Sequence, residues 1–203
     1  MFITFEGIDL SGKSTQAKLL FDFLKKKKKK AIFLREPGGT RVSEEIRNLL
    51  LHKSDLQISS LTEFMLFSAA RCQLTEEVIK PNLAKGITVI CDRYYDSSTA
   101  YQGYGGKLDR DVIKKINVIA SGNLKPDLTF LIDISYSESL KRKGKSHKPD
   151  RIEKKKSDYF NKVTAGYRDI AKKSKKRVKL IDGTKSIEHI HSQIVEIYNK
   201  RIK

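Results

Sequence analysis

The residues best suited to chemistry near the start of the chain lie in one short loop. Gly7 and Gly12 are separated by four residues, and Lys13 and Ser14 follow directly. This spacing is typical of loops whose backbone N–H groups surround the phosphates of a nucleotide, with the lysine on the β- and γ-phosphates and the hydroxyl on Mg²⁺. The pattern therefore predicts a nucleoside triphosphate site. The alternative interpretation is a plain glycine turn before a helix.

Two residues inside this loop are unexpected in a site for anions. Asp9 adds a negative charge, and Leu10 places a bulky apolar side chain ahead of the lysine. The dipole of a following helix would stabilise an acid at this position, which gives Asp9 one structural role. Leu10 has no charge to offer, so further positive charge for a transferred phosphoryl group must come from another part of the chain.

A second group of candidate residues follows the apolar run "GITVICD" at 86–92. Asp92 ends this run and Arg93 comes next, so both would lie at the carboxyl edge of a strand, where open α/β sheets bind their ligands. Asp92 is a candidate for ordering Mg²⁺ together with Ser14, and Arg93 would face the same ligand-binding crevice. The alternative for Asp92 is a polar strand terminus.

The elements that must position these residues alternate along the chain. Short apolar runs predict strands at 2–7, 31–35, 86–92, 127–133 and 177–182. Helical spacing of apolar residues predicts helices at 13–27 and 42–51, and a longer one through Phe64 to about Lys80, where Pro81 is expected to stop it. Strands that alternate with helices predict an α/β fold with a five-stranded parallel sheet flanked by helices on both faces.

The charged segment 141–157 has no apolar periodicity. We expect a loop there and not a linker between domains, because a chain of 203 residues suits one compact unit. The prediction is a single domain over residues 1–203.

Composition narrows the classes of function. The apolar runs are far shorter than the roughly 20 residues of a membrane span, so we expect no membrane partner and a cytoplasmic location. Cys72 and Cys91 lack metal-ligand spacing and are expected to be ordinary buried thiols. The formal net charge is +18, but lysine is spread along the chain without interleaved aromatic residues. This favours a solvated lysine-rich surface over specific nucleic-acid binding, and the lysine run 25–30 is expected to end a helix.

Five motifs stand in the order and spacing found in bacterial thymidylate kinases, which the chain resembles over essentially its full length. They are the glycine-rich loop at 7–14, "REPGGT" at 35–40, "FSAAR" at 67–71, "DRYYDSSTAYQG" at 92–103 and "DRIE" at 150–153. The resemblance implies a nucleoside monophosphate kinase fold of the P-loop type. It also implies ATP and dTMP as substrates, Mg²⁺ as cofactor, dTDP and ADP as products, and a homodimer.

The resemblance further implies roles for individual residues. ATP is expected on Gly7, Ile8, Asp9, Leu10, Ser11, Gly12, Lys13, Ser14 and Thr15, with Mg²⁺ at Ser14 and Asp92. The acceptor dTMP is expected on Glu36, Pro37, Arg47, Phe67, Arg71, Arg93, Ser98, Tyr101 and Gln102.

Each acceptor role has a physical sense. Phe67 would stack on thymine, while Arg71 and Gln102 would contact its polar edge. Arg47 and Arg93 would hold the acceptor phosphate. Ser98 and Tyr101 would line the deoxyribose, the loop of Glu36 and Pro37 would close over the acceptor, and Asp9 would lie near its 3′-hydroxyl. The alternatives are that Phe67 belongs to the helix core and that Arg47 or Arg71 lies on a solvated helix face.

The chain departs from the family pattern at Leu10 and in the lid loop, which the resemblance places at about 141–157. Members carry glycine in place of Leu10 together with lid arginines, or arginine together with a lid that lacks them. Leucine is expected to go with lid arginines, but only Arg142 and Arg151 occur, at the edges of a lysine-rich stretch. They join Lys13, Arg93 and Asp9 as catalytic candidates. Arg142 is the first choice, Lys145 a weaker helper, and His147 a solvated loop residue.

Two other functions remain open at this point. One is a kinase of the same fold that acts on a different nucleoside monophosphate or on a deoxynucleoside. The other is a P-loop protein that binds a nucleotide in order to regulate or to grip nucleic acid, which only the net charge of +18 suggests.

Overall fold

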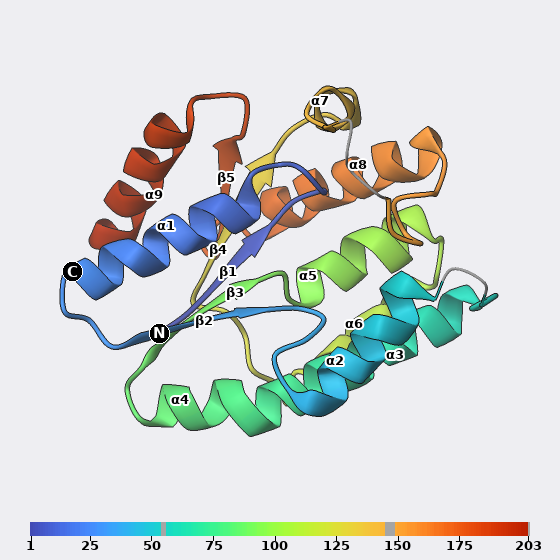
Figure 1. Cartoon of the computed structure of the whole chain (residues 1–203), viewed down its shortest axis with the longest axis horizontal. Coiled ribbons are helices and arrows are strands. Elements are labelled where there is room, and N and C mark those ends of the chain that lie inside the picture. The colour runs from blue at the N-terminus through green and yellow to red at the C-terminus, as the bar shows by residue number, and fades with distance from the viewer. Residues whose placement is uncertain (54–55, 145–148, 203) are drawn as a thin grey trace.

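The computed structural model describes residues 1–53, 56–144 and 149–202 (Figure 1). Within these residues five strands form one parallel sheet in the order β2-β3-β1-β4-β5. The strands are β1 (Phe2–Glu6), β2 (Ala31–Arg35), β3 (Thr88–Asp92), β4 (Leu128–Asp133) and β5 (Val178–Asp182). The predicted α/β fold is confirmed. Each strand lies where the sequence predicted it, with small differences at the ends.

Helices cover both faces of the sheet. Their bounds are α1 (Lys13–Lys26), α2 (Arg41–Arg47), α3 (Ser60–Leu74), α4 (Lys80–Ala84), α5 (Tyr95–Ser98), α6 (Arg110–Ala120), α7 (Tyr136–Lys141), α8 (Ser157–Lys173) and α9 (Ile187–Ile202). Three π-helical segments also occur among the described residues: η1 (Asn48–His52), η2 (Thr75–Ile79) and η3 (Thr99–Gly105).

The two faces of the sheet have separate cores because side chains alternate along each strand. Ile3 and Phe5 of β1 pack in one cluster with Leu20 of α1 and Ile194 of α9. Phe2 points to the opposite face and packs with residues of α3 and η2. Every residue of β1 is buried, as expected for a central parallel strand with helices on both sides. Figure 1 shows α1 and α9 together on one side of the sheet.

The end of the long helical stretch differs from the prediction. The chain continues past Pro81 to Ala84, because Thr75–Ile79 is π-helical and the Lys80 N–H bonds to the Thr75 carbonyl, five residues back. Pro81 then lies at the first turn of α4, where a missing N–H costs little. The proline marks the start of a new α segment.

Three other sequence predictions can be compared with the structure. α1 ends at Lys26, so the lysine run 25–30 does end a helix. Cys91 is buried as predicted, but Cys72 is exposed on α3, so the prediction of two buried thiols is wrong for Cys72. In the segment 141–157 the described part is mostly loop and turn, yet Ile152 is buried in a core cluster. No helix within the described residues is long and apolar enough to cross a membrane.

Candidate active site

The glycine-rich loop joins the carboxyl end of β1 to the N-terminus of α1. Gly7 has a φ of 141°, and a Cβ atom there would lie 2.6 Å from the Ile132 carbonyl oxygen, so no other residue fits without a shift. Gly12 directly precedes α1 with a φ of 94°, in the left-handed region that glycine adopts at no steric cost. Leu10 has a φ of 61°, a conformation that costs a leucine about 1–2 kcal/mol. Gly7, Leu10 and Gly12 thus all adopt positive φ values, and these three positions set the path of the loop.

The lysine predicted to be catalytic and the two metal candidates lie in neighbouring positions of this loop and of β3. Lys13 is buried, and its Nζ is 3.6 Å from Oδ1 of Asp9. The Ser14 hydroxyl donates to Oδ2 of Asp92. Oδ1 of Asp92 is buried and has no hydrogen-bond partner among the described residues.

These two oxygen-bearing side chains fit a magnesium ion. Mg²⁺ prefers oxygen ligands, keeps several waters and usually takes only one or two protein ligands beside the phosphates. No cluster of three or more His, Cys, Asp or Glu side chains suited to a metal lies in the described part of the chain. The unpartnered oxygen of Asp92 and the exposed Ser14 are what such a metal needs.

All nine residues predicted to bind the acceptor line one cavity of about 120 Å³. They are Glu36, Pro37, Arg47, Phe67, Arg71, Arg93, Ser98, Tyr101 and Gln102, and the cavity is completed by Asp9, Leu51, Ser97, Asp150 and Ile152. Asp9 belongs to the glycine-rich loop, so the cavity adjoins the predicted phosphate site. The structure thus brings together segments from five distant parts of the sequence.

Phe67 and Arg71 occupy one face of α3, but with different burial. Phe67 is partly exposed and lines the cavity, so it is not core. Arg71 is 2% exposed, which excludes the solvated-face interpretation. Its guanidinium donates to Glu36 at 2.8 Å, to Ser98 at 3.1 Å, to Asn117 at 3.3 Å and to the Tyr94 carbonyl at 3.2 Å. A guanidinium has five N–H groups, so one is left for a ligand in the cavity.

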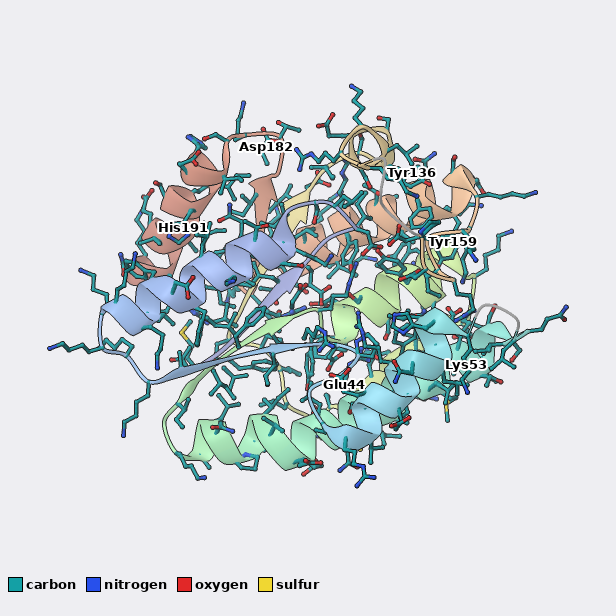
Figure 2. All side chains as sticks on the ribbon, in the orientation of Figure 1. Glu44, Lys53, Tyr136, Tyr159, Asp182 and His191 are labelled. Atoms are coloured by element: carbon teal, nitrogen blue, oxygen red, sulfur yellow. The ribbon has the colours of Figure 1, made fainter. Side chains whose placement is uncertain are left out.

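Glu36 is the counter-ion of Arg71 and is itself deeply buried. Burial raises the pKa of Glu36 to about 7, even though Arg71 favours the charged form. Its Oε1 has no hydrogen-bond partner among the described residues. The loop that carries Glu36 is held by Glu44 of α2, labelled in Figure 2, which accepts hydrogen bonds from the Gly39 N–H at 2.8 Å and from Arg35 at 3.0 Å. Arg47 donates to the Pro37 carbonyl at 2.9 Å.

Arg93 connects the acceptor cavity to the glycine-rich loop. Its φ of 73° is unusual for a side chain other than glycine. The guanidinium donates to the Gly7 carbonyl at 2.9 Å, to Asp9 at 2.5 Å and to the Tyr101 hydroxyl at 3.2 Å. Burial alone would raise the pKa of Asp9, but Arg93 and Lys13 hold it well below its usual range. Asp9 is therefore an ionised carboxylate that accepts hydrogen bonds where the cavity meets the glycine-rich loop.

Sequence reasoning missed two buried acids beside this junction. Glu6, the last residue of β1, accepts hydrogen bonds from the Tyr94 N–H at 2.8 Å, from Ser97 at 2.6 Å and from Tyr167 at 3.0 Å. Burial and the nearby Asp96 raise the pKa of Glu6 to about 7. An acid that closes an apolar strand next to a glycine was the available signal.

Glu63 is the second missed acid. It is 2% exposed on α3 and accepts hydrogen bonds from Gln102, Arg151 and Lys155. Its position, four residues before Phe67 and eight before Arg71, puts all three on one helix face. That spacing was the signal that could have identified it.

The two lid arginines lie on different sides of the site. Arg142, just after α7, donates to the carbonyls of Leu10 at 3.4 Å, Ser11 at 3.3 Å and Gly183 at 2.8 Å. Arg151 donates instead to the Leu50 carbonyl at 2.8 Å and to Glu63 at 2.7 Å. Two predictions for the centre of the lid fall outside the described residues. These are Lys145 as a weaker catalytic helper and His147 as a solvated loop residue.

Comparison with known proteins agrees with this geometry. The sequence model of the family described as "Thymidylate kinase" matches residues 5–194. Thymidylate kinases from Thermosipho melanesiensis and Kosmotoga olearia are 47% and 44% identical to the chain, over 97% of its length and 96% and 94% of theirs. A crystal structure of thymidylate kinase from Ehrlichia chaffeensis superposes with a TM-score of 0.80 at 36% identity and covers 98% of each chain. A glycine-rich phosphate loop beside a basic and aromatic cavity, with relatives this similar over nearly their whole length, means that the chain belongs to the thymidylate kinase family.

Proposed function

We propose that this chain is a single-domain enzyme that transfers the γ-phosphoryl group of ATP to dTMP, giving dTDP and ADP. The observation that carries the proposal is the shared cavity: nine acceptor residues chosen from the sequence line one space that adjoins the glycine-rich loop. Family membership supports the same reaction. Two free cysteines suit the reducing cytoplasm as its compartment.

The donor side of the reaction rests on the glycine-rich loop. The N–H groups at the start of α1 bind the phosphates of ATP, and Lys13 contacts the β- and γ-phosphates. Ser14 and Asp92 would hold Mg²⁺, which supplies charge neutralisation on the transferred group when bound. Phosphoryl transfer asks mainly for positioning and charge, so no strong general base is required.

The acceptor side positions dTMP for attack. Arg47 and Arg93 bind its phosphate, and Phe67 stacks on the thymine ring. Tyr101 walls the deoxyribose, and its hydroxyl donates to Asp9 at 3.1 Å. Asp9 is ionised and accepts a hydrogen bond from Arg93, so it orients this arginine toward the reacting phosphate. In the proposed complex the Asp9 carboxylate also lies near the 3′-hydroxyl of dTMP.

An acceptor panel tests the reaction. Purified protein is expected to turn over ATP fastest with dTMP, more slowly with dUMP, and least with dCMP and dGMP, in a coupled ADP assay. Fastest turnover with another monophosphate would assign the chain to a different nucleotide kinase activity. ATP turnover that does not depend on any monophosphate, together with salt-sensitive DNA binding, would favour the nucleic-acid interpretation.

We also propose a homodimer. Exposed apolar residues form one stripe on α3 at Leu61, Met65, Ala69 and Cys72, with spacings of four, four and three. A second stripe on the neighbouring α6 includes Val112 and Ile119, which are 42% and 74% exposed. Apolar stripes on adjacent helices suit a self-complementary interface.

The dimer is tested by the mass in solution. Met65→Glu is expected to shift the light-scattering mass from two chains to one, because it buries a charge in the proposed interface. Leu180→Glu is the matched control, since Leu180 is 52% exposed on β5, away from both stripes. A dimer that persists with Met65→Glu, or a parent protein that is monomeric, would contradict the proposal.

A further inference from the structure

The starting observation is the buried carboxylate of Glu63, which the proposed reaction does not use directly. It receives the Gln102 amide at 2.9 Å on Oε1 and Arg151 at 2.7 Å on Oε2, with Lys155 at 3.3 Å on Oε1. Glu63 therefore joins a residue that lines the acceptor cavity to two cations that lie outside it.

The chemistry of the pair sets the orientation of the Gln102 amide. A carboxylate can only accept hydrogen bonds, so the amide group that faces Glu63 must be the donor Nε2. The amide oxygen Oε1 then lies on the other end of the same planar group. Among the described residues no hydrogen-bond donor contacts Oε1, and Gln102 lines the cavity. The acceptor atom of Gln102 is left for the ligand.

Arg71 contributes a hydrogen-bond donor to the cavity, whereas Gln102 contributes an acceptor. Arg71 can only donate, and four of its five N–H groups are engaged by the protein. The cavity thus offers a base one donor from Arg71 and one acceptor from Gln102. Thymine and uracil present the complement, a carbonyl at position 4 and an N–H at position 3. Cytosine presents the reverse at both positions, an amino group and an unprotonated nitrogen.

We propose that Glu63 is a positioning residue that fixes the Gln102 amide with its oxygen toward the acceptor base and thereby selects thymine and uracil over cytosine. The proposal rests on the dTMP kinase function. A glutamine held by a neutral amide or by water could turn over at little cost and read either pattern, whereas a carboxylate permits one orientation only.

The measurement is the ratio of kcat/KM for dUMP to that for dCMP, since these acceptors differ only at the edge that the pair reads. The parent ratio is expected to be at least about 100, because a site built to bond a polar edge rejects the mismatched edge strongly. Glu63→Gln, which keeps the shape but can both donate and accept, is expected to lower this ratio by about tenfold or more.

A matched control separates base selection from anchoring of the lid. Lys155→Met removes a second contact of Glu63 but leaves the bond to Gln102 intact, and its ratio is expected to stay within about twofold of the parent. If Glu63→Gln and Lys155→Met both slow the reaction and leave the ratio unchanged, Glu63 only anchors the lid and the proposal is overturned.

A double-mutant cycle tests whether Glu63 acts through Gln102. In a Gln102→Met background, Glu63→Gln is expected to change the ratio by less than about twofold. A further drop as large as that in the parent background would overturn the proposal. Gln102→Met alone also decides the case if Glu63→Gln fails to fold, because an unchanged ratio there means that the amide does not read the base.

The outcome for dTMP keeps the two claims distinct. A parent enzyme that phosphorylates dTMP but shows the same ratio as its Glu63→Gln variant would retain the proposed function and lose the inference. A parent that does not phosphorylate dTMP would lose the proposed function itself.

Discussion

The two sides of the reaction centre hold their positive charge in different ways. On the acceptor side, Arg71 and Arg93 are buried or nearly so and are bonded to acids, Glu36 and Asp9. On the donor side, Lys13 is buried and lies 3.6 Å from Asp9. Arg142 is partly exposed and donates mainly to backbone carbonyls, at 2.8, 3.3 and 3.4 Å, with one further bond to Glu138 at 3.3 Å. The acceptor charges are fixed when the chain folds. To reach a transferred phosphoryl group, Arg142 would exchange its carbonyl partners for phosphate oxygens, which are stronger acceptors for a guanidinium.

The largest effect is expected at Lys13. Lys13→Ala should lower kcat by at least about 10³-fold, because in the proposed reaction the lysine contacts the phosphates that carry the developing charge. Far-ultraviolet circular dichroism should match the parent. Lys18→Ala is the control, since Lys18 is exposed on the same helix and is expected to leave turnover unchanged. Turnover of Lys13→Ala within about tenfold of the parent would remove the lysine from the mechanism.

The lid arginines are expected to divide between the two sides. Arg142→Ala should lower the single-turnover rate by about 10–1,000-fold with a much smaller rise in the KM for ATP, the sign of a contact made chiefly in the transition state. Arg151→Ala should instead raise the KM for dTMP, because Arg151 contacts Glu63 on the acceptor side. Single-turnover rates and KM values at saturating partner substrate measure both. Near-parental rates for both variants would place the missing charge elsewhere.

Phe67 offers a test confined to the acceptor side. Phe67→Ala should weaken dTMP binding by about 1–3 kcal/mol, the usual value of a stacking contact with a base, and leave ATP binding nearly unchanged. Isothermal titration with each nucleotide gives both affinities from one preparation. An equal loss for ATP and dTMP would show that the substitution disturbs the fold and not a stacking wall.

The last expected effect does not concern activity but the pH dependence of stability. The folded-state pKa of Glu36 is raised to about 7 by burial, from 4.5, so the folded state binds more protons than the unfolded state between these values. This contribution to stability is present at low pH and is lost as pH rises toward 7. In Glu36→Gln the free energy of unfolding should fall less between pH 5 and pH 7.5, by on the order of 2 kcal/mol.

Urea unfolding at several pH values measures this difference. Glu6, whose pKa is also raised to about 7, remains in the variant and leaves a smaller slope of the same sign. Asp9 has a lowered pKa and changes stability only at more acidic pH, outside this window. Parallel pH profiles for parent and variant would show that Glu36 does not titrate there.

The sequence was most informative where local pattern and function coincide. The apolar strand Phe2–Glu6, the glycine spacing and the helix after it determine the phosphate loop without reference to the rest of the chain. Eight of the nine residues predicted to bind the acceptor belong to the ordered set of motifs, and all nine line one cavity. Arg47 lies outside these motifs and was placed only by the resemblance over the full chain.

Pairings between distant residues were not predictable in the same way. Glu63 and Arg151 are 88 positions apart, and nothing local to either indicates that they meet. Arg142 and the Gly183 carbonyl are separated by 41 positions. The end of the helix at Pro81 was missed because a π turn changes which N–H groups must be bonded, and side-chain periodicity does not report that change.

The π-helical segment Thr99–Gly105 affects how the chain tolerates insertions and deletions. Tyr101 and Gln102 belong to this segment, and the Gly106 N–H bonds to the Tyr101 carbonyl, five residues back. Each residue of an α-helix turns the chain by about 100°, so loss of one residue just before Tyr101 would rotate the hydroxyl and the amide away from Arg93 and Arg71. Most surface segments absorb a change of one residue in length. This segment should accept substitutions far better than any change in length, and homologous chains should align through it without gaps.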